Sequence, residues 1–266
     1  MKVPNYLFTT ILILCIGCSD YQKALKSEDV AVKNNLAVEL YEQGKYRKAA
    51  QLFTQLKELY RGKPQAERIV FFYANSLLET RNYILAAYEF ETFVRAYPKS
   101  QKAEEASFLM AYSHYKISPN FSLDQTDTYE ALDKIQEFID KYPSSERMEQ
   151  ANAMAQELRI KTERKGFEIA KQYNTIRDYK ASIKALDNFI ADNPGTSYRE
   201  GALFVQFTAA TTLAINSVEY KKQNRLEDAK SKYENFKRLY PDSTHMEDAE
   251  EMMEDIDKEI RTFASN

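Results

Sequence analysis

The chain has 266 residues, of which 44% are hydrophobic and 29% are charged, and its formal net charge is −3. This near balance of charge gives no electrostatic footprint for nucleic acid, so we expect no nucleic-acid partner. Both cysteines lie within the first 18 residues, which excludes disulfides from the rest of the chain. The remaining residues, about 250, are enough to form a core without them.

Residues 1–17 predict a lipoprotein signal peptide. Lys2 is followed by an apolar run from Tyr6 to Ile16, which is shorter than the roughly 20 residues that cross a bilayer. The run ends in Cys15-Ile16-Gly17-Cys18, which resembles a bacterial lipobox except that cysteine replaces the usual leucine. We therefore expect a covalent lipid on Cys18, no other cofactor, and a tether over residues 18–30. An ordinary signal peptide with an incidental cysteine is the alternative.

The residue after Cys18 bears on which membrane the lipid enters. Ser19 does not resemble the aspartate that retains lipoproteins at the inner membrane in enterobacteria. We therefore expect the lipid anchor to lie in the outer membrane, on its periplasmic side.

One helical pattern then occurs five times. A small residue is followed four and seven positions later by large apolar residues, which places all three on one face of a helix. The small residues are Ala49, Ala86, Ala131, Ser182 and Ala229; the next are Phe53, Phe90, Ile135, Leu186 and Tyr233; the last are Leu56, Phe93, Phe138, Phe189 and Phe236. Four copies end before a proline, namely Pro98, Pro143, Pro194 and Pro241, because proline disfavours helical geometry in the residue before it.

This pattern resembles the second helix of a tetratricopeptide repeat. A first helix precedes the copies, with alanine in place of the usual glycine, as in Ala37–Leu40 and Ala74–Leu77. The resemblance implies an all-α fold, a solenoid of five tetratricopeptide-like helix pairs. A C-terminal capping helix is expected after Thr244, because Ala249, Met253, Ile256 and Ile260 form one apolar stripe on an acidic segment.

The five predicted repeats are not uniform. Repeats one and two span about 31–64 and 65–98, and repeat three, from Ser100, carries an insertion over Ser118–Asp124. Repeat four opens with about 30 residues that lack proline, from Ser145 to Ile176, which predicts a helix of about 45 Å. The first helix of repeat five, from Ser197, is also expected to be long and to end near Lys222.

The sequence offers little for catalysis. His114 and His245 have no metal-ligating neighbours in a known spacing, and the six glycines form no phosphate-binding loop. No Gly-x-Ser-x-Gly motif is present. We therefore expect no catalytic residue, no metal site and no enzyme.

Some aromatic residues fall outside the packing pattern. In tetratricopeptide folds these first-helix positions face a concave groove, which suits an extended client peptide. By register the groove residues are Asn34, Val38, Tyr41 and Glu42, then Arg68, Phe71, Asn75 and Leu78, and finally Phe108, Tyr112 and Tyr115. The alternative is that Phe71 and Tyr112 only pack between repeats.

The whole arrangement resembles the BamD-type lipoproteins of the outer-membrane β-barrel assembly machinery. The match is most specific in Ala170–Ala181 and in three Phe-x-x-x-Tyr-Pro-x-Ser strings, Phe93–Ser100, Phe138–Ser145 and Phe236–Ser243. The resemblance implies that residues 31–143 receive C-terminal segments of unfolded outer-membrane proteins. It also implies that residues 144–266 hold the POTRA domains of a BamA-like β-barrel protein, and we place that contact around Arg177, Arg199 and Glu227.

Two other interpretations stay open at this point. One is another tetratricopeptide adaptor lipoprotein, such as a pilotin that helps a secretin ring to assemble. The other is a peptidoglycan-modifying enzyme on a helical solenoid, which would require paired carboxylates in a cleft. Loss of the gene separates the first alternative, since a barrel-assembly component is expected to be needed for growth and a pilotin is not.

Overall fold

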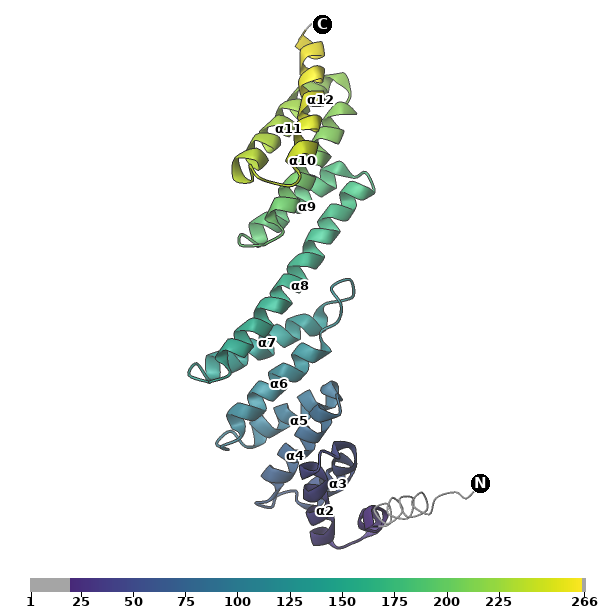
Figure 1. Ribbon diagram of the computed structural model, residues 1–266, viewed down its shortest axis with the longest axis vertical. Coiled ribbons are helices and arrows are strands. Elements are labelled where there is room, and N and C mark those ends of the chain that lie inside the picture. The colour runs from purple at the N-terminus through teal and green to yellow at the C-terminus, as the bar shows by residue number, and fades with distance from the viewer. Residues whose placement is uncertain (1–19, 265–266) are drawn as a thin grey trace, which may run out of the picture. The chain divides into compact units, whose positions relative to one another are not determined.

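A computed structural model describes residues 20–264. Every regular element in that range is a helix, which confirms the predicted all-α class (Figure 1). The helices are α2 Val30–Glu42, α3 Tyr46–Leu59, α4 Ala66–Glu79, α5 Tyr83–Ala96, α6 Ala103–Ile117, α7 Thr126–Lys141, α8 Met148–Thr175, α9 Tyr179–Asp192, α10 Arg199–Ile215, α11 Glu219–Leu239 and α12 Met246–Ala264. They form five pairs, α2/α3 to α10/α11, and α12 caps the last pair.

The small residue of each copy lies where two helices touch. All five of these side chains have 0% exposed surface: Ala49, Ala86, Ala131, Ser182 and Ala229. The residues seven positions later are buried as well, from Leu56 to Phe236. A side chain larger than alanine or serine would hold the neighbouring helix away, so the buried small residue explains the close helix pairing that the sequence predicted.

The Tyr-Pro-x-Ser strings have a structural role in three of the repeats. Each serine hydroxyl donates to a glutamate in the first turn of the first helix of the repeat that ends just before that serine. The pairs are Ser100–Glu67 at 2.5 Å, Ser145–Glu104 at 2.6 Å and Ser243–Glu200 at 2.6 Å. Each serine also accepts a backbone N–H two residues later. We call this arrangement the serine clamp; it fixes the end of one helix beside the start of its partner.

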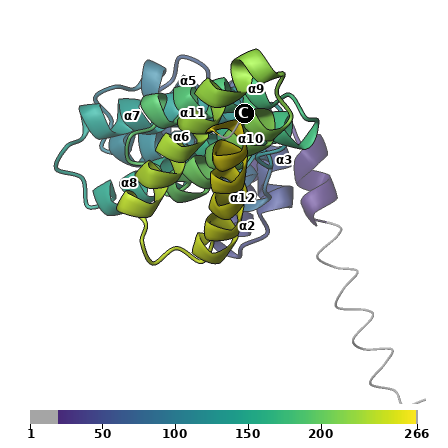
Figure 2. The same ribbon diagram turned by 90° about the horizontal axis from the view of Figure 1, so that it is seen from above.

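The chain packs as two compact units. Unit 1 contains the described residues up to Pro119 together with Gln125–Ala155, and unit 2 contains Asn120–Asp124 and the described residues from Gln156 on. The packing therefore divides inside α8, and the functional division at residue 143 stays a prediction. In unit 2, α12 lies beside α10 and α11 in both views (Figures 1 and 2).

Two predictions about long helices had different outcomes. The first helix of repeat four is α8, with 28 residues, as predicted. The first helix of repeat five was predicted wrongly, since α10 ends at Ile215 and not near Lys222. Hydroxyl groups near its end, such as Thr212 and Ser217, bond to carbonyls one turn earlier, and Val218 is extended. The extra length belongs to α11, which begins at Glu219.

The predicted tether is partly folded. Residues 20–26 are helical, and Tyr21 and Ala24 are buried at 7% and 1% exposure. The Tyr21 hydroxyl donates to Gln51 of α3, and Lys48 lies over the Tyr21 ring. The start of the described chain therefore packs on repeat one.

Candidate functional site

The groove residues of repeats one and two lie on α2 and α4. Asn75 donates its side-chain amide to the Tyr41 hydroxyl, and the Tyr41 ring stacks on Phe72 with centroids 4.6 Å apart. Burial is the main cause that raises the pKa of Tyr41 above its usual value. Asn34 and Val38 are half-buried on the same helix as Tyr41. The structure thus joins Tyr41 and Asn75 into one polar pair at the edge of an aromatic cluster.

Phe71 and Leu78 are more buried than their companions, with 5% and 8% exposed surface. The Phe71 ring packs edge-on against Phe90 and Phe93, at 6.0 and 5.5 Å between centroids. Phe71 therefore contributes to the core of repeat two, between α4 and α5. One side of it still borders a surface hollow, which the sequence did not reveal.

That hollow, which we call the α4 hollow, encloses about 350 Å³ and is lined by Pro64, Glu67, Arg68, Phe71, Phe72, Phe93 and Lys102. Its floor is aromatic, and two cations stand at its rim. The Arg68 guanidinium lies 5.0 Å from the Phe72 ring centre, and the Lys102 ammonium lies 5.2 Å from that of Phe71. Such a site can hold an apolar side chain while the cations attract a negative group beside it.

Tyr112 lies one repeat further along, on α6. It is half-buried, and its ring lies 6.4 Å from Phe108 and 6.2 Å from Tyr115. Lys116 is placed over both tyrosine rings, at 5.1 and 5.0 Å. Tyr112 does not line the α4 hollow, so the predicted groove residues fall into separate clusters.

A second hollow, the α10 hollow, lies among α9, α10 and α11 and encloses about 650 Å³. Its lining is mostly polar and includes Asp187, Arg199, Gln206, Lys232 and Arg238. Gln206 is 4% exposed and donates to Asp187 and to the Ile183 carbonyl. Opposite charges stand side by side here, which suits a polar partner surface more than an apolar peptide.

The three residues predicted for the partner surface do not form one cluster. Arg199 lines the α10 hollow and donates to the Pro194 carbonyl at 3.4 Å. Arg177 is exposed in the turn after α8, with a φ of 67°, and Glu227 lies on α11, where it accepts from Gln223. Sequence reasoning missed Gln206, Lys232 and Arg238, because the residues of this hollow come from three helices in different registers.

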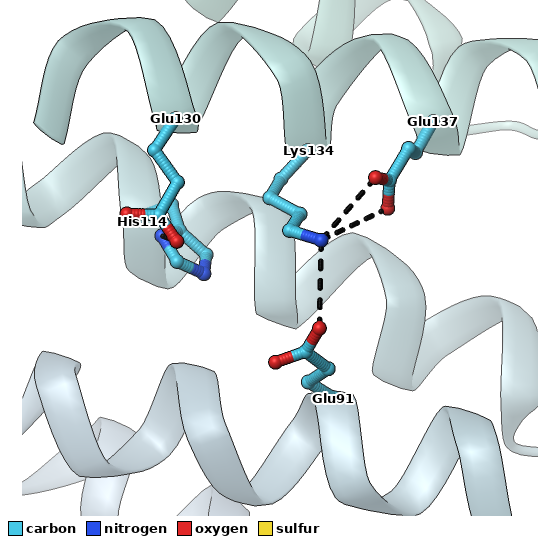
Figure 3. Close-up of polar contacts among 5 residues, drawn as sticks. All are labelled: Glu91, His114, Glu130, Lys134 and Glu137. Atoms are coloured by element: carbon cyan, nitrogen blue, oxygen red, sulfur yellow. Dashed lines mark hydrogen bonds and ion pairs between the residues drawn. The ribbon is translucent and has the colours of Figure 1, made fainter. Parts of the chain in front are cut away.

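A charged cluster joins three helices of unit 1 (Figure 3). Lys134 of α7 contacts Glu91 of α5 at 3.5 Å and Glu137 at 3.2 Å. His114 of α6 lies 3.8 Å from Glu130. Burial is the main cause that lowers the pKa of His114, against the opposite effect of Glu130. Burial also acts to lower the pKa of Lys134, but Glu137 and Glu91 together raise it. The contacts tie neighbouring repeats together.

Two further findings concern metals and the membrane. Among residues 20–264, no group of three or more histidine, cysteine or acidic side chains is placed to hold a metal ion. Within the same range, no helix combines the length and the apolar character needed to cross a bilayer. The signal peptide over 1–17 and the lipid site at Cys18 lie outside the described residues.

Comparison with known proteins adds a family and two relatives. The family model described as "YfiO: Outer membrane lipoprotein" matches residues 34–226 and 168–262. The chain is 25% identical over 149 residues to the outer membrane protein assembly factor BamD of Helicobacter pylori, an alignment that covers 53% of the chain and 66% of that protein. It is 24% identical over 149 residues to the protein of the same name from Rickettsia prowazekii, over 54% of the chain and 59% of that protein.

The alignments thus cover less than two thirds of the length of either relative. The family match is more extensive, because it covers well over half of the chain, including residues of both units. The relatives and the family agree with the resemblance that the repeats and the lipobox predicted. The chain belongs to the YfiO family of outer membrane lipoproteins.

Proposed function

We propose that the protein is a non-enzymatic lipoprotein of the β-barrel assembly machinery, held on the periplasmic side of the outer membrane by a lipid on Cys18. Residues 31–143 receive C-terminal segments of unfolded outer-membrane proteins. Residues 144–266 hold the POTRA domains of a BamA-like β-barrel protein. Support comes from the two relatives, both named as outer membrane protein assembly factors, and from the different character of the two hollows.

The observation that carries the client proposal is the α4 hollow. An unfolded segment offers apolar side chains and, at its end, a free carboxylate. The floor formed by Phe71, Phe72 and Phe93 accepts the side chain, and Arg68 and Lys102 attract the carboxylate. Asn75 lies seven residues beyond Arg68 on the same helix, about 10 Å away, where its amide and the Tyr41 hydroxyl can bond to the peptide backbone.

The partner proposal relies on the α10 hollow. A folded domain presents polar groups of both signs, and complementary charges give specificity and register more than raw affinity. Arg199, Lys232 and Arg238 alternate there with acidic side chains. This surface is therefore suited to a folded partner, while the α4 hollow is suited to an extended one.

The sharpest test of client binding reverses the charge at the rim of the α4 hollow. Arg68→Glu with Lys102→Glu is expected to weaken binding of a peptide that ends in a bulky apolar residue by about tenfold or more, because each charge-assisted contact contributes about 1.5–3 kcal/mol. Fluorescence anisotropy with the full chain in detergent measures it. The matched control, Arg95→Glu with Lys99→Glu, carries the same charge change at exposed positions outside the hollow and is expected to bind normally.

An amidated copy of the peptide identifies the contact. Because amidation removes the carboxylate, the amidated peptide is expected to bind wild type weakly. Its affinity is expected to fall little further with the double variant, which is the result expected when the carboxylate and the rim cations interact directly. If the double variant instead weakens binding of the amidated peptide as much as binding of the free acid, the rim cations do not bind the carboxylate.

The aromatic anchors give a second test. Tyr41→Ala with Phe71→Ala is expected to remove about 2 kcal/mol or more of peptide affinity per true hot spot. Because Phe71 is 5% exposed, the circular dichroism spectrum must first show that the helices persist. Loss of peptide and partner binding together, with the fold intact, would contradict the division between the two halves.

Partner binding is tested by co-purification from detergent-solubilised membranes. Arg177→Glu with Arg199→Glu is expected to lose a large β-barrel protein from the preparation while the client peptide still binds. The same preparation separates the pilotin alternative, for which a secretin and not a BamA-like protein would co-purify. Wild-type recovery of the β-barrel protein with the double variant would place the contact elsewhere.

The anchor has its own test. Cys18→Ala is expected to move the protein from the membrane to the soluble periplasmic fraction, since the lipid supplies the hydrophobic attachment. Its circular dichroism spectrum is expected to stay helical. Retention of the variant in the outer membrane would show that Cys18 is not the anchoring residue.

A further inference from the structure

The insertion of repeat three is held against the long helix of repeat four. The Arg164 guanidinium lies 3.9 Å from the centre of the Phe121 ring, and Lys165 donates to the Leu123 carbonyl. Within the loop, Asn120 accepts from both the backbone and the hydroxyl of Ser122, at 3.1 Å each. These contacts give the loop a defined shape, so it serves as a wall beside α8.

A third hollow, the α8 hollow, lies between this wall and the helix. It encloses about 460 Å³. Phe121 lines one side, and Lys165, Glu168, Ile169, Lys171 and Gln172 of α8 line the other. All of these residues belong to unit 2, and none of them lines the α4 hollow or the α10 hollow.

An exposed apolar stripe runs along α8 from the hollow. Ile169 and Tyr173 of α8 are 48% and 38% exposed, and Ile176, in the turn just after the helix, is 63% exposed. Their spacing of four and three places them on one side. Phe167 and Ala170, on another side, are buried, and Phe167 packs against Phe189 of α9. The fold therefore does not use the stripe, and adjacent exposed apolar side chains of this size mark an interaction surface.

The charge around the hollow indicates the chemistry of its partner. From Lys161 to Lys171 the chain has four basic and two acidic residues, although its overall net charge is −3. The Lys171–Glu168 pair is weak, because its atoms are 3.9 Å apart and both side chains are nearly half exposed. Lys171 can therefore pair with a carboxylate of an incoming molecule.

We propose that the α8 hollow docks an acidic segment of a partner polypeptide, with a bulky apolar side chain seated between Phe121 and Ile169. Carboxylates of the segment pair with Lys171 and with the other cations of this helix, and further apolar residues cover Tyr173 and Ile176. An anionic lipid surface fits less well, because the site is concave. This site adds a third polypeptide contact to the proposed client and POTRA sites.

A random peptide library displayed on phage, selected on the full chain in detergent, tests the proposal without a known partner. We expect enrichment of peptides that combine aspartate or glutamate with phenylalanine, leucine or isoleucine. Synthetic copies are expected to bind wild type and to lose about tenfold or more in affinity with Ile169→Asp, since the variant removes a large apolar side chain that the bound segment would bury.

Matched variants separate the hollow from the rest of the surface. Lys171→Glu is expected to weaken the same peptides, whereas Lys180→Glu, an exposed position on α9, is not. Ile160→Asp serves as the apolar control, because Ile160 is 40% exposed on the same helix but does not line the hollow. Phe121→Ala removes the opposite wall and is expected to weaken binding with the α-helical spectrum unchanged.

Three outcomes would overturn the proposal. The first is enrichment of basic or uncharged peptides, and the second is equal binding by Ile169→Asp and wild type. The third is binding of vesicles of phosphatidylglycerol and phosphatidylethanolamine that depends on Ile169 and Lys171 while no peptide binds, which would make this face a membrane contact.

Discussion

The two compact units bury the same kinds of residue at the repeated positions, but their helices differ in length. In unit 1, helices α2 to α7 have 13 to 16 residues. In repeats four and five, helices α8, α10 and α11 have 28, 17 and 21 residues. Even so, Ala86 in one unit and Ala229 in the other are both fully buried. The inward-facing residues thus define a repeat, while the length of its helices is free to vary.

The surfaces differ in the same way. The α4 hollow of unit 1 has a floor of phenylalanine, whereas the α10 hollow of unit 2 is lined mainly by charged and amide side chains. Phe93 of the α4 hollow belongs to the repeated positions, whereas Arg68, Phe71, Phe72 and Lys102 do not. The comparison teaches that binding character in this chain is set mainly outside the repeated positions.

The largest expected effect tests whether the cores are equivalent. Phe93→Ala and Phe236→Ala remove fully buried rings at the same register position in units 1 and 2, and each is expected to cost about 3–5 kcal/mol of unfolding free energy. Hydrogen exchange is expected to show the loss only in the helices of the affected unit, since repeats contact their neighbours. Equal loosening of α10 to α12 by Phe93→Ala would contradict this.

A buried ion pair found in unit 1 is expected to give the next largest effect. Glu89 is 2% exposed and accepts from Lys57 at 2.6 Å. Removing one partner of a buried pair costs about 3–5 kcal/mol, and because Lys57 is 28% exposed and can regain water, we expect about 2–3 kcal/mol for Glu89→Ala in urea unfolding.

The matched variant in unit 2 is Asp257→Ala. Its pair with Lys230 is nearly half exposed on both sides, at 3.7 Å. We expect its effect to fall within the error of the same urea measurement, because exposed ion pairs contribute little. A large effect of Asp257→Ala would mean that exposure does not explain the difference.

The serine clamp is expected to contribute equally in the two units. Ser100→Ala and Ser243→Ala each remove a hydrogen bond to a partly exposed carboxylate, which we expect to cost about 1–2 kcal/mol. Among residues 20–264, the hydroxyl of Thr196, the equivalent in repeat four, accepts only from the nearby Tyr198 N–H, so Thr196→Val is expected to cost less. Thermal or urea unfolding of the three variants measures the order.

The smallest effect is a pH dependence confined to unit 1. Burial lowers the pKa of His114, and Glu130, Lys134, Glu91 and Asp127 face it with mixed charge. The unfolded chain, with a histidine pKa of about 6.5, therefore binds the proton more readily than the folded one. Stability is expected to fall as the pH drops below about 6.5. His114→Gln is expected to flatten this part of the curve, and an unchanged slope would exclude His114.

The sequence predicted the fold well for a physical reason. Positions such as Ala86, Phe90 and Phe93 repeat because the geometry of a helix pair allows few alternatives there. The end of α10 was missed because the hydroxyl groups near it, on Thr212 and Ser217, bond to carbonyls one turn earlier just as Thr208 and Thr211 do inside the helix, so they do not mark a helix end in the sequence.

The candidate sites were predicted less completely. Register placed Arg68 and Phe71 correctly on α4, but it could not show that Phe93 and Lys102 complete the α4 hollow. Those residues come from the next helix and the linker after it, and their approach depends on how α4 and α5 pack. The α8 hollow was missed for the same reason. Its wall depends on the contact between Arg164 of α8 and Phe121 of the insertion, and the sequence does not show that these two residues meet.

The serine clamp has a consequence for how repeats of this kind can change by insertion. It requires the C-terminal end of the second helix to lie level with the N-terminal end of the first, so it forms only where the two helices of a repeat have similar lengths. The loop Ser118–Asp124 leaves the clamp of repeat three intact, because it enters at the opposite end of the pair. In repeat four the first helix extends past that level, and Glu149 lies in the first turn of the 28-residue α8. Lengthening the first helix at its N-terminal end therefore removes the hydrogen bond of the clamp and adds exposed helical surface. New contacts can evolve on this surface that the shorter repeats cannot offer.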